Sequence, residues 1–163
     1  MWSRAPDTPY ILVDMAALDV VDRYLNALVE TGGEARRLGH GEWGVTVRSE
    51  ATGEWPLDLG IRLVDGMLRA QAHALRASDA LNPWNLLHWN RQTRLVRFAC
   101  TREGDIWVHG DLPAPAVDEP SLDRLLGLVA EAALAARELE RGSAALGAAP
   151  EADTRPAGAW PAI

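Results

Sequence analysis

Apolar positions along the chain first repeat at helical spacing and later change to the alternation that is typical of β-strands. Between residues 15 and 29 they recur every three or four positions, at Met15, Leu18, Val21, Leu25, Leu28 and Val29. This spacing predicts an amphipathic helix. Gly32 and Gly33 favour its end, because glycine readily takes the left-handed conformation of a helix C-cap.

Five later stretches alternate apolar and polar residues, as strands with one buried face do. The first three cover residues 43–48, 57–63 and 68–74, and Asp65-Gly66 between the last two is a strong hairpin signal. The other two strands are predicted over 95–101 and 106–110, joined by a turn at Glu103-Gly104.

Two more helices are predicted. A short one follows Asn82, which can cap its first turn, and Pro83, which suits the first helical position. A long one starts around residues 118–121 and has Gly142 just past its predicted end. Its apolar stripe consists of Leu122, Leu125, Leu126, Val129, Ala133 and Ala136.

The predicted order of elements is αβββαββα. This order favours an α+β fold with a single antiparallel sheet and the two long helices packed on one face. Residues 1–142 form the predicted domain, and residues 143–163, rich in Ala, Gly and Pro, are expected to form a flexible tail. Trp160 in that tail is either incidental or a contact with the domain or a partner.

Composition excludes several classes of protein. The 163 residues include 16 basic side chains, all of them arginine. A chain without lysine cannot be a Walker A nucleotidase, a protein kinase or a pyridoxal enzyme. The single cysteine excludes an intramolecular disulfide, and no apolar run approaches the ~18 residues of a membrane span. A cytoplasmic protein is therefore expected.

A GxGxxG match at Gly39, Gly41 and Gly44 lacks the strand-then-helix context of a dinucleotide site and is interpreted as a turn. Cys100 alternates in phase with Val96 and Phe98, which predicts a place in the core.

The histidines do not have metal-ligand spacing. His73 and His109 could face each other, and a small enzyme built on them with Asp111 remains a minor alternative. The sequence predicts no catalytic residue, no metal site and no cofactor.

The outward face of the predicted sheet carries the first candidate binding surface. It holds four arginines against one carboxylate, within a protein of net charge −7. Arginine suits carboxylate, phosphate or carbonyl partners, and a tryptophan could add stacking; simple solvation of the face is the alternative. The predicted partner-binding residues are Arg48, Arg62, Arg69, His73, Arg97, Trp107 and His109.

The second candidate surface is the short predicted helix, which holds two tryptophans and two leucines in six residues. These side chains cannot all face one core, so a homodimer contact is expected. Packing within the chain and a ligand groove are the alternatives. The predicted dimer residues are Trp84, Leu87, His88 and Trp89.

Residues 81–140 in particular resemble the YbjN-like family of bacterial sensory transduction regulators, and the resemblance covers about residues 10–142. The resemblance depends on Asn90, Arg97-Phe98, Gly104-Asp105, Asp111-Leu112-Pro113 and Glu138-Leu139. It implies a fold similar to that of type III secretion chaperones, which work as homodimers and bind segments of other proteins.

Together these features predict a non-enzymatic, homodimeric protein-binding module, either chaperone-like or a regulatory adaptor. Residues 111–163 carry 9 acidic side chains against 4 arginines, which would suit a basic partner, including one that itself binds nucleic acid. The alternative is direct nucleic-acid binding by the arginine-bearing face, which the net charge disfavours.

Overall fold

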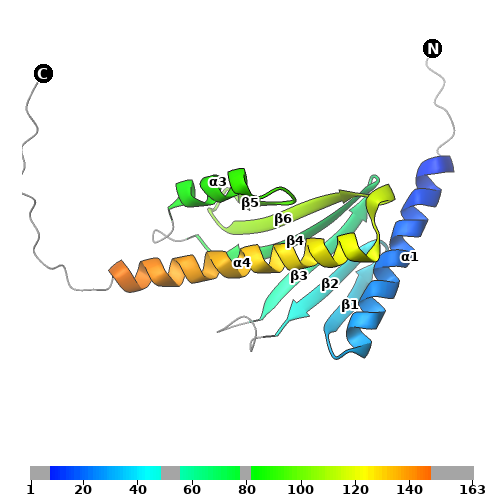
Figure 1. Cartoon of the computed structure of the whole chain (residues 1–163), viewed down its shortest axis with the longest axis horizontal. Helices are drawn as coiled ribbons and strands as arrows, with labels where there is room; N and C mark the ends of the chain where they lie inside the picture. Colours follow the sequence, from blue (N-terminus) through cyan, green and yellow to red (C-terminus); the bar gives the residue numbers. More distant parts are fainter. Residues whose placement is uncertain (1–7, 49–55, 78–81, 148–163) are drawn as a thin grey trace, which may run out of the picture.

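The computed structural model describes residues 8–48, 56–77 and 82–147, and in these ranges one six-stranded sheet carries two long helices on one face (Figure 1). The strands follow the order β1-β2-β3-β4-β6-β5, and every neighbouring pair is antiparallel. The predicted α+β fold is confirmed. The elements are α1 (Thr8–Glu30), β1 (Glu34–Gly39), β2 (Glu42–Val47), β3 (Leu57–Val64), β4 (Met67–Leu75), α3 (Pro83–Gln92), β5 (Val96–Cys100), β6 (Ile106–Pro113), η1 (Ala114–Ala116) and α4 (Glu119–Gly147).

The first hairpin contains a strand that the sequence pattern does not reveal. β1 pairs with β2, with Ala35 opposite Val45 and Arg37 opposite Trp43. Because β1 is an edge strand with only one small apolar side chain directed at the core, its sequence shows no alternation. Gly41 lies in the turn of this hairpin with φ of +68°, so the GxGxxG match is a turn, as predicted.

The strand register places the apolar side chains where their alternation predicts. Opposite residues such as Val45 and Leu59, or Leu59 and Ala72, lie on the same face of the sheet. The buried members of this inner face are Trp43, Val45, Leu57, Leu59, Ile61, Leu63, Leu68, Ala70, Ala72, Ala74, Val96, Phe98, Ile106 and Val108. The polar set therefore lies on the opposite, outer face.

Helix α4 packs on a strip of small residues in the middle of the sheet. Ala70, Ala72 and Ala74 of β4 are buried, and Gly110 of β6 pairs with Ala70. A Cβ atom on Gly110 would lie 2.7 Å from Leu125 Cδ1 and 2.8 Å from the Leu95 carbonyl oxygen. The buried stripe of α4 that covers this strip consists of Leu122, Leu125, Leu126, Val129, Ala133 and Ala136.

Polar contacts fix α1 over the other half of the sheet. The carboxylate of Asp22 accepts a hydrogen bond of 2.7 Å from Trp43 Nε1 and another of 2.7 Å from Arg37 Nη1. The Arg37 guanidinium also lies 5.8 Å from the centre of the Trp43 ring. Asp22 thus joins α1 to both strands of the first hairpin.

The prediction that Cys100 belongs to the core is wrong, because its side chain is exposed. Cys100 is the last residue of an edge strand and has a strand neighbour on one side only, Ile106. Val96 and Phe98, earlier in the same strand, are buried as predicted.

Helix α4 continues through Gly142 to Gly147, past its predicted end. A glycine inside a helix costs about 1 kcal/mol relative to alanine, and the neighbouring alanines of the sequence offset this cost. Residues 148–163, including Trp160, lie outside the described residues. None of the helices in the described ranges is both long and apolar enough to cross a membrane.

We expect Gly110→Ala to lower the free energy of unfolding by about 1–3 kcal/mol, because the new methyl group would overlap α4 and a backbone carbonyl. Urea denaturation measures this change. Gly60→Ala is the matched control, since its Cβ would meet only Gln71 Cγ at an ordinary 3.8 Å. Equal losses in the two variants would contradict close packing at Gly110.

Tyr24 provides a pH-dependent link between α1 and α4. Its hydroxyl donates a hydrogen bond of 2.6 Å to Asp123. Partial burial, followed by this hydrogen bond and the negative charge of Asp123, raises the pKa of Tyr24 to about 12 from 10.0. Because the folded state favours the protonated phenol, its contribution to the free energy of unfolding is complete below pH 10. This contribution is lost as the pH rises through about 12.

The lysine-free sequence makes this effect measurable, because the tyrosines are the side chains expected to titrate between pH 10 and 12. In a Tyr10→Phe background, we expect the free energy of unfolding to fall across this window. Adding Tyr24→Phe should remove the fall. Chemical denaturation at several pH values tests this, and an unchanged fall without Tyr24 would refute the assignment.

Candidate functional site

The outer face of the sheet brings together the seven predicted partner-binding residues. The strand register places Arg62 opposite Arg69, His73 opposite Trp107, and Arg97 opposite His109. Arg48 follows the end of β2 on the same face. The sequence pattern therefore places these residues on one surface.

The charge balance of this outer face differs from the prediction. Arg69 donates hydrogen bonds of 2.7 and 3.2 Å to the two carboxylate oxygens of Asp111, which raise the pKa of the guanidinium. Arg62 lies 3.2 Å from Glu42, and Arg48 lies 2.8 Å from Glu34. The outer face therefore carries more carboxylates than the single one predicted, and its excess of arginine is smaller than predicted.

Carboxylates that the prediction did not count cause this difference. Glu34 comes from the strand that the sequence pattern missed, whereas Glu42 and Asp111 lie at the strand ends, in phase with the outer set. Alternation could have revealed the latter two. Arg97, the remaining predicted arginine, donates to the carbonyl oxygens of Thr93 and Val96 at 3.0 and 2.7 Å.

Aromatic and imidazole side chains occupy the part of the outer face formed by β4 and β6. His73 and Trp107 make an edge-to-face contact with ring centres 5.3 Å apart. His73 Nε2 lies 3.9 Å from Asp105, and His109 Nδ1 lies 3.7 Å from Asp111. Each histidine thus neighbours a different carboxylate. No group of three or more metal-ligating side chains occurs among the residues that the structure describes.

Helix α3 presents most of the predicted dimer residues to solvent. Trp84 is 75% exposed, Leu87 is 56% exposed, and His88 is also exposed. Trp89 is instead half-buried, with its ring centre 5.7 Å from that of Phe98. Three of the four predicted residues therefore face outward from the helix, and Trp89 packs toward the sheet.

Local capping positions α3 as the sequence predicts. The Asn82 side chain accepts a hydrogen bond of 3.0 Å from the Trp84 amide, and Pro83 occupies the first turn. Leu86 is the buried residue of this helix.

Asn90 fixes α3 against the edge of the sheet, a role that sequence reasoning missed. Its carboxamide accepts a hydrogen bond of 2.7 Å from the Phe98 amide and donates one of 3.0 Å to the Phe98 carbonyl. The side chain thus pairs with β5 as a neighbouring strand would. This contact orients the exposed side chains of the helix and covers the middle of an edge strand.

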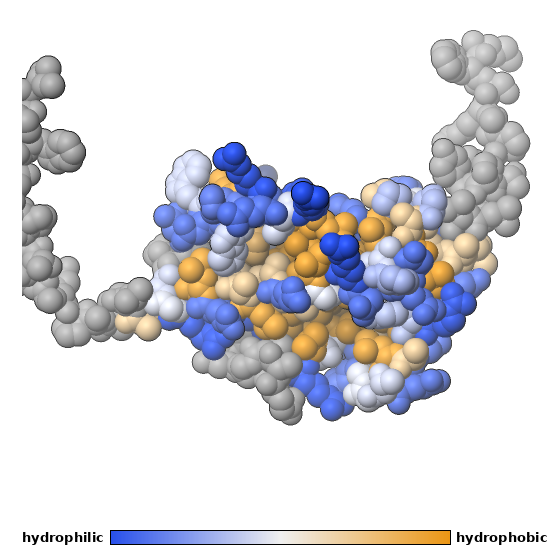
Figure 2. Space-filling model, viewed as in Figure 1, coloured by the Kyte–Doolittle hydropathy of each residue, from blue (hydrophilic) through white to orange (hydrophobic). Residues whose placement is uncertain are grey.

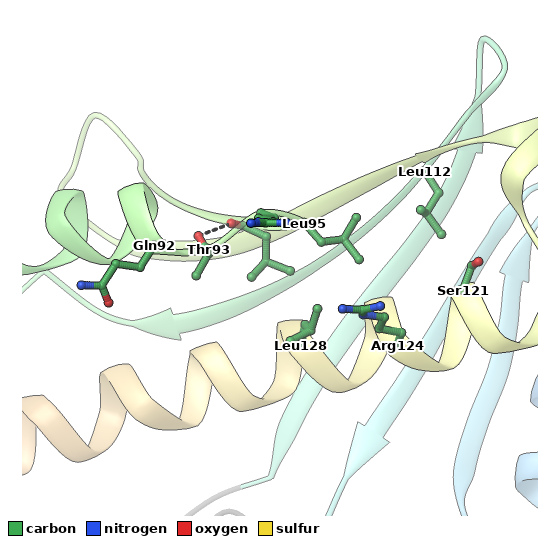
Figure 3. A pocket seen from close by; sticks show the side chains of 9 residues that line it. Gln92, Thr93, Leu95, Leu112, Ser121, Arg124 and Leu128 are labelled. Carbon is green, nitrogen blue, oxygen red and sulfur yellow. Dashed lines mark hydrogen bonds between the residues drawn. The ribbon is translucent and has the colours of Figure 1, made fainter.

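A groove of about 620 Å³ lies between α4 and the strands β5 and β6 (Figure 3). Leu95, Leu112 and Leu128 extend into the space between the strands and the helix (Figure 3). Its residues come from segments far apart in the sequence, so no local motif reveals it. The lining consists of Gln92, Thr93, Arg94, Leu95, Val96, Leu112, Ser121, Arg124 and Leu128.

Residues 65–139 match the model of the YbjN family, described as "Putative bacterial sensory transduction regulator". The predicted family resemblance is confirmed over this range. A comparison with curated protein sequences finds no match.

Solved structures with this fold include a complex of a type III secretion chaperone. This is the Yersinia pestis chaperone SycH with a fragment of YscM2 (TM-score 0.55, 14% identity, 73% of this chain and 98% of that chain covered). Others are the HopA1-SchA chaperone-effector complex (0.59, 14%, 76% and 97%) and the ExsC-ExsE complex (0.52, 14%, 71% and 90%). These similarities establish a shared fold.

We expect Asn90→Ala to lower the free energy of unfolding by about 1–3 kcal/mol, because it leaves the amide and carbonyl of Phe98 without these partners. Asn85→Ala, the same substitution at an exposed position of the same helix, is the control and should be neutral or slightly stabilising. Thermal or urea unfolding compares the two variants. Equal effects would show that the Asn90 contact contributes nothing to stability.

Proposed function

We propose that the protein is a non-enzymatic, homodimeric protein-binding module of the bacterial cytoplasm that acts as a chaperone-like or regulatory adaptor. The observation that carries this proposal is the exposed apolar surface of α3, formed by Trp84 and Leu87. Asn90 holds this surface in one orientation. Large apolar side chains on a fixed helix suit a stable protein contact.

The dimer contact that we propose is isologous, with α3 of each subunit facing its copy in the partner subunit. In such a contact every residue appears twice, so a ten-residue helix supplies two tryptophans and two leucines from its exposed positions. His88 lies beside them and forms a 2.9 Å contact with Gln92. Trp89 packs against Phe98 of β5 and so holds the helix against the sheet.

The partner protein is proposed to contact the outer face at Arg48, Arg62, Arg69, His73, Arg97, Trp107 and His109. Because Arg48, Arg62 and Arg69 already pair with carboxylates, recognition on this face would depend on hydrogen bonds and on the Trp107 ring more than on net charge. Exposed Glu131 and Glu138 on α4 would suit basic groups of a partner.

The shared fold supports this proposal by analogy. Each of the three similar structures is a complex of two proteins: SycH with a fragment of YscM2, HopA1 with SchA, and ExsC with ExsE. Direct nucleic-acid binding is less favoured, because the arginine excess on which it depended is reduced by Glu34, Glu42 and Asp111.

The dimer is tested by light scattering at tens of micromolar protein. We expect the wild type to have twice the mass of one chain, and Trp84→Ala/Leu87→Ala to shift toward the monomer, because the variant loses both exposed anchors. Leu38→Ala is the matched control: Leu38 is 58% exposed, almost the same as Leu87, but lies on β1. A monomeric wild type, or equal dissociation of the control, would refute the proposed contact.

A further inference from the structure

The groove beside α4 extends further than its main opening. A second hollow of about 270 Å³ shares Gln92, Thr93, Val96 and Leu128 with it. This hollow adds apolar lining from Trp89, Phe98, Ala132 and Ala135. The two together form one channel between α4 on one side and α3 and β5 on the other, which we call the α4 channel. Figure 2 shows hydrophobic surface along α4 on this side of the molecule, interrupted by hydrophilic side chains.

Charges are distributed unevenly along the α4 channel. Arg94 and Arg124 line its larger part, where no carboxylate belongs to the lining. Glu131 lines its smaller part. Neither arginine forms an ion pair with any residue in the described part of the chain. By contrast, Arg62 and Arg69 on the outer face lie within 3.2 Å of a carboxylate.

We propose that the α4 channel binds a segment of the partner protein that carries apolar side chains and, at one end, carboxylates that pair with Arg94 and Arg124. This inference rests on the proposed protein-binding function and assigns it a second surface. The apolar lining takes the side chains of the segment, and the two guanidinium groups select its acidic end. The carboxylate of Glu131 would repel an acidic residue at the other end, and this repulsion fixes the direction in which the segment binds.

A second copy of the chain fits the α4 channel less well than such a partner. The exposed apolar side chains of α3 are the obvious candidates for insertion by another subunit. That helix contains no carboxylate and carries Arg91, so it cannot pair with the two guanidinium groups. The charges of the channel therefore favour a different protein.

The test is selection of binding peptides from a random displayed library on the full-length protein. We expect enriched peptides to combine apolar residues with Asp or Glu toward one end. Their labelled synthetic forms should bind Arg94→Glu/Arg124→Glu about tenfold more weakly or worse in fluorescence polarisation, because each reversed charge repels a carboxylate. Arg76→Glu/Arg102→Glu is the control: it makes the same charge change at exposed residues outside the channel and should leave affinity unchanged.

Several results would overturn the proposal. Enriched peptides without acidic residues, or equal loss of affinity in the control, would remove the charge argument.

Peptides whose binding is lost in Trp107→Ala but not in the channel variant would place the partner on the outer face and leave the protein-binding function intact. Loss of dimer mass in the channel variant would assign the channel to a second copy. Binding seen only after residues 148–163 are removed would assign it to the chain itself. A monomeric wild type that enriches no peptide would refute the channel and the proposed function together.

Discussion

The close approach of α4 to the middle of the sheet is the contact on which the remaining structure depends. Ala70 and Ala72 on β4 and Gly110 on β6 leave room for Leu125 and Val129 to reach the strands. Protein interiors are packed so densely that one added methyl group lowers the free energy of unfolding. A larger residue at Gly110 would have to displace the Leu95 carbonyl and helix α4. Moving α4 would in turn disturb the core between the helix and the sheet.

The same geometry explains why the α4 channel exists. Six strands about 4.8 Å apart span about 24 Å between the axes of the two edge strands, whereas a helix with its side chains covers about 10 Å. Helix α1 covers the side of β1, and α4 covers β4 and β6. The short α3 lies against the edge of β5 through Asn90. The inner face beside β5 is therefore left partly uncovered, and Leu95, Leu112 and Leu128 line the space.

Sequence periodicity predicted most of the fold, because on a half-buried strand or helix the apolar residues recur at the period with which side chains face the core. It placed Leu59, Ala72 and Val108 correctly and grouped the outer residues on one face. It missed β1, whose edge position removes the need for alternating apolar residues, and it misplaced Cys100 at a strand end. Side-chain pairing, as at Asn90, and the α4 channel depend on contacts between distant segments, which local patterns do not encode.

Ion pairing with carboxylates distinguishes Arg48, Arg62 and Arg69 on the outer face from Arg94 and Arg124 in the α4 channel. On the outer face, a charged ligand would have to replace existing contacts such as that between Arg69 and Asp111, and would gain little. Arg94 and Arg124 are exposed but form no ion pair in the described part of the chain, so an approaching carboxylate gains an ion pair there without displacing one. The net charge of −7 repels an acidic ligand at long range. Selectivity for such a ligand therefore has to come from these short-range contacts, which act on the dissociation rate, and not from electrostatic steering.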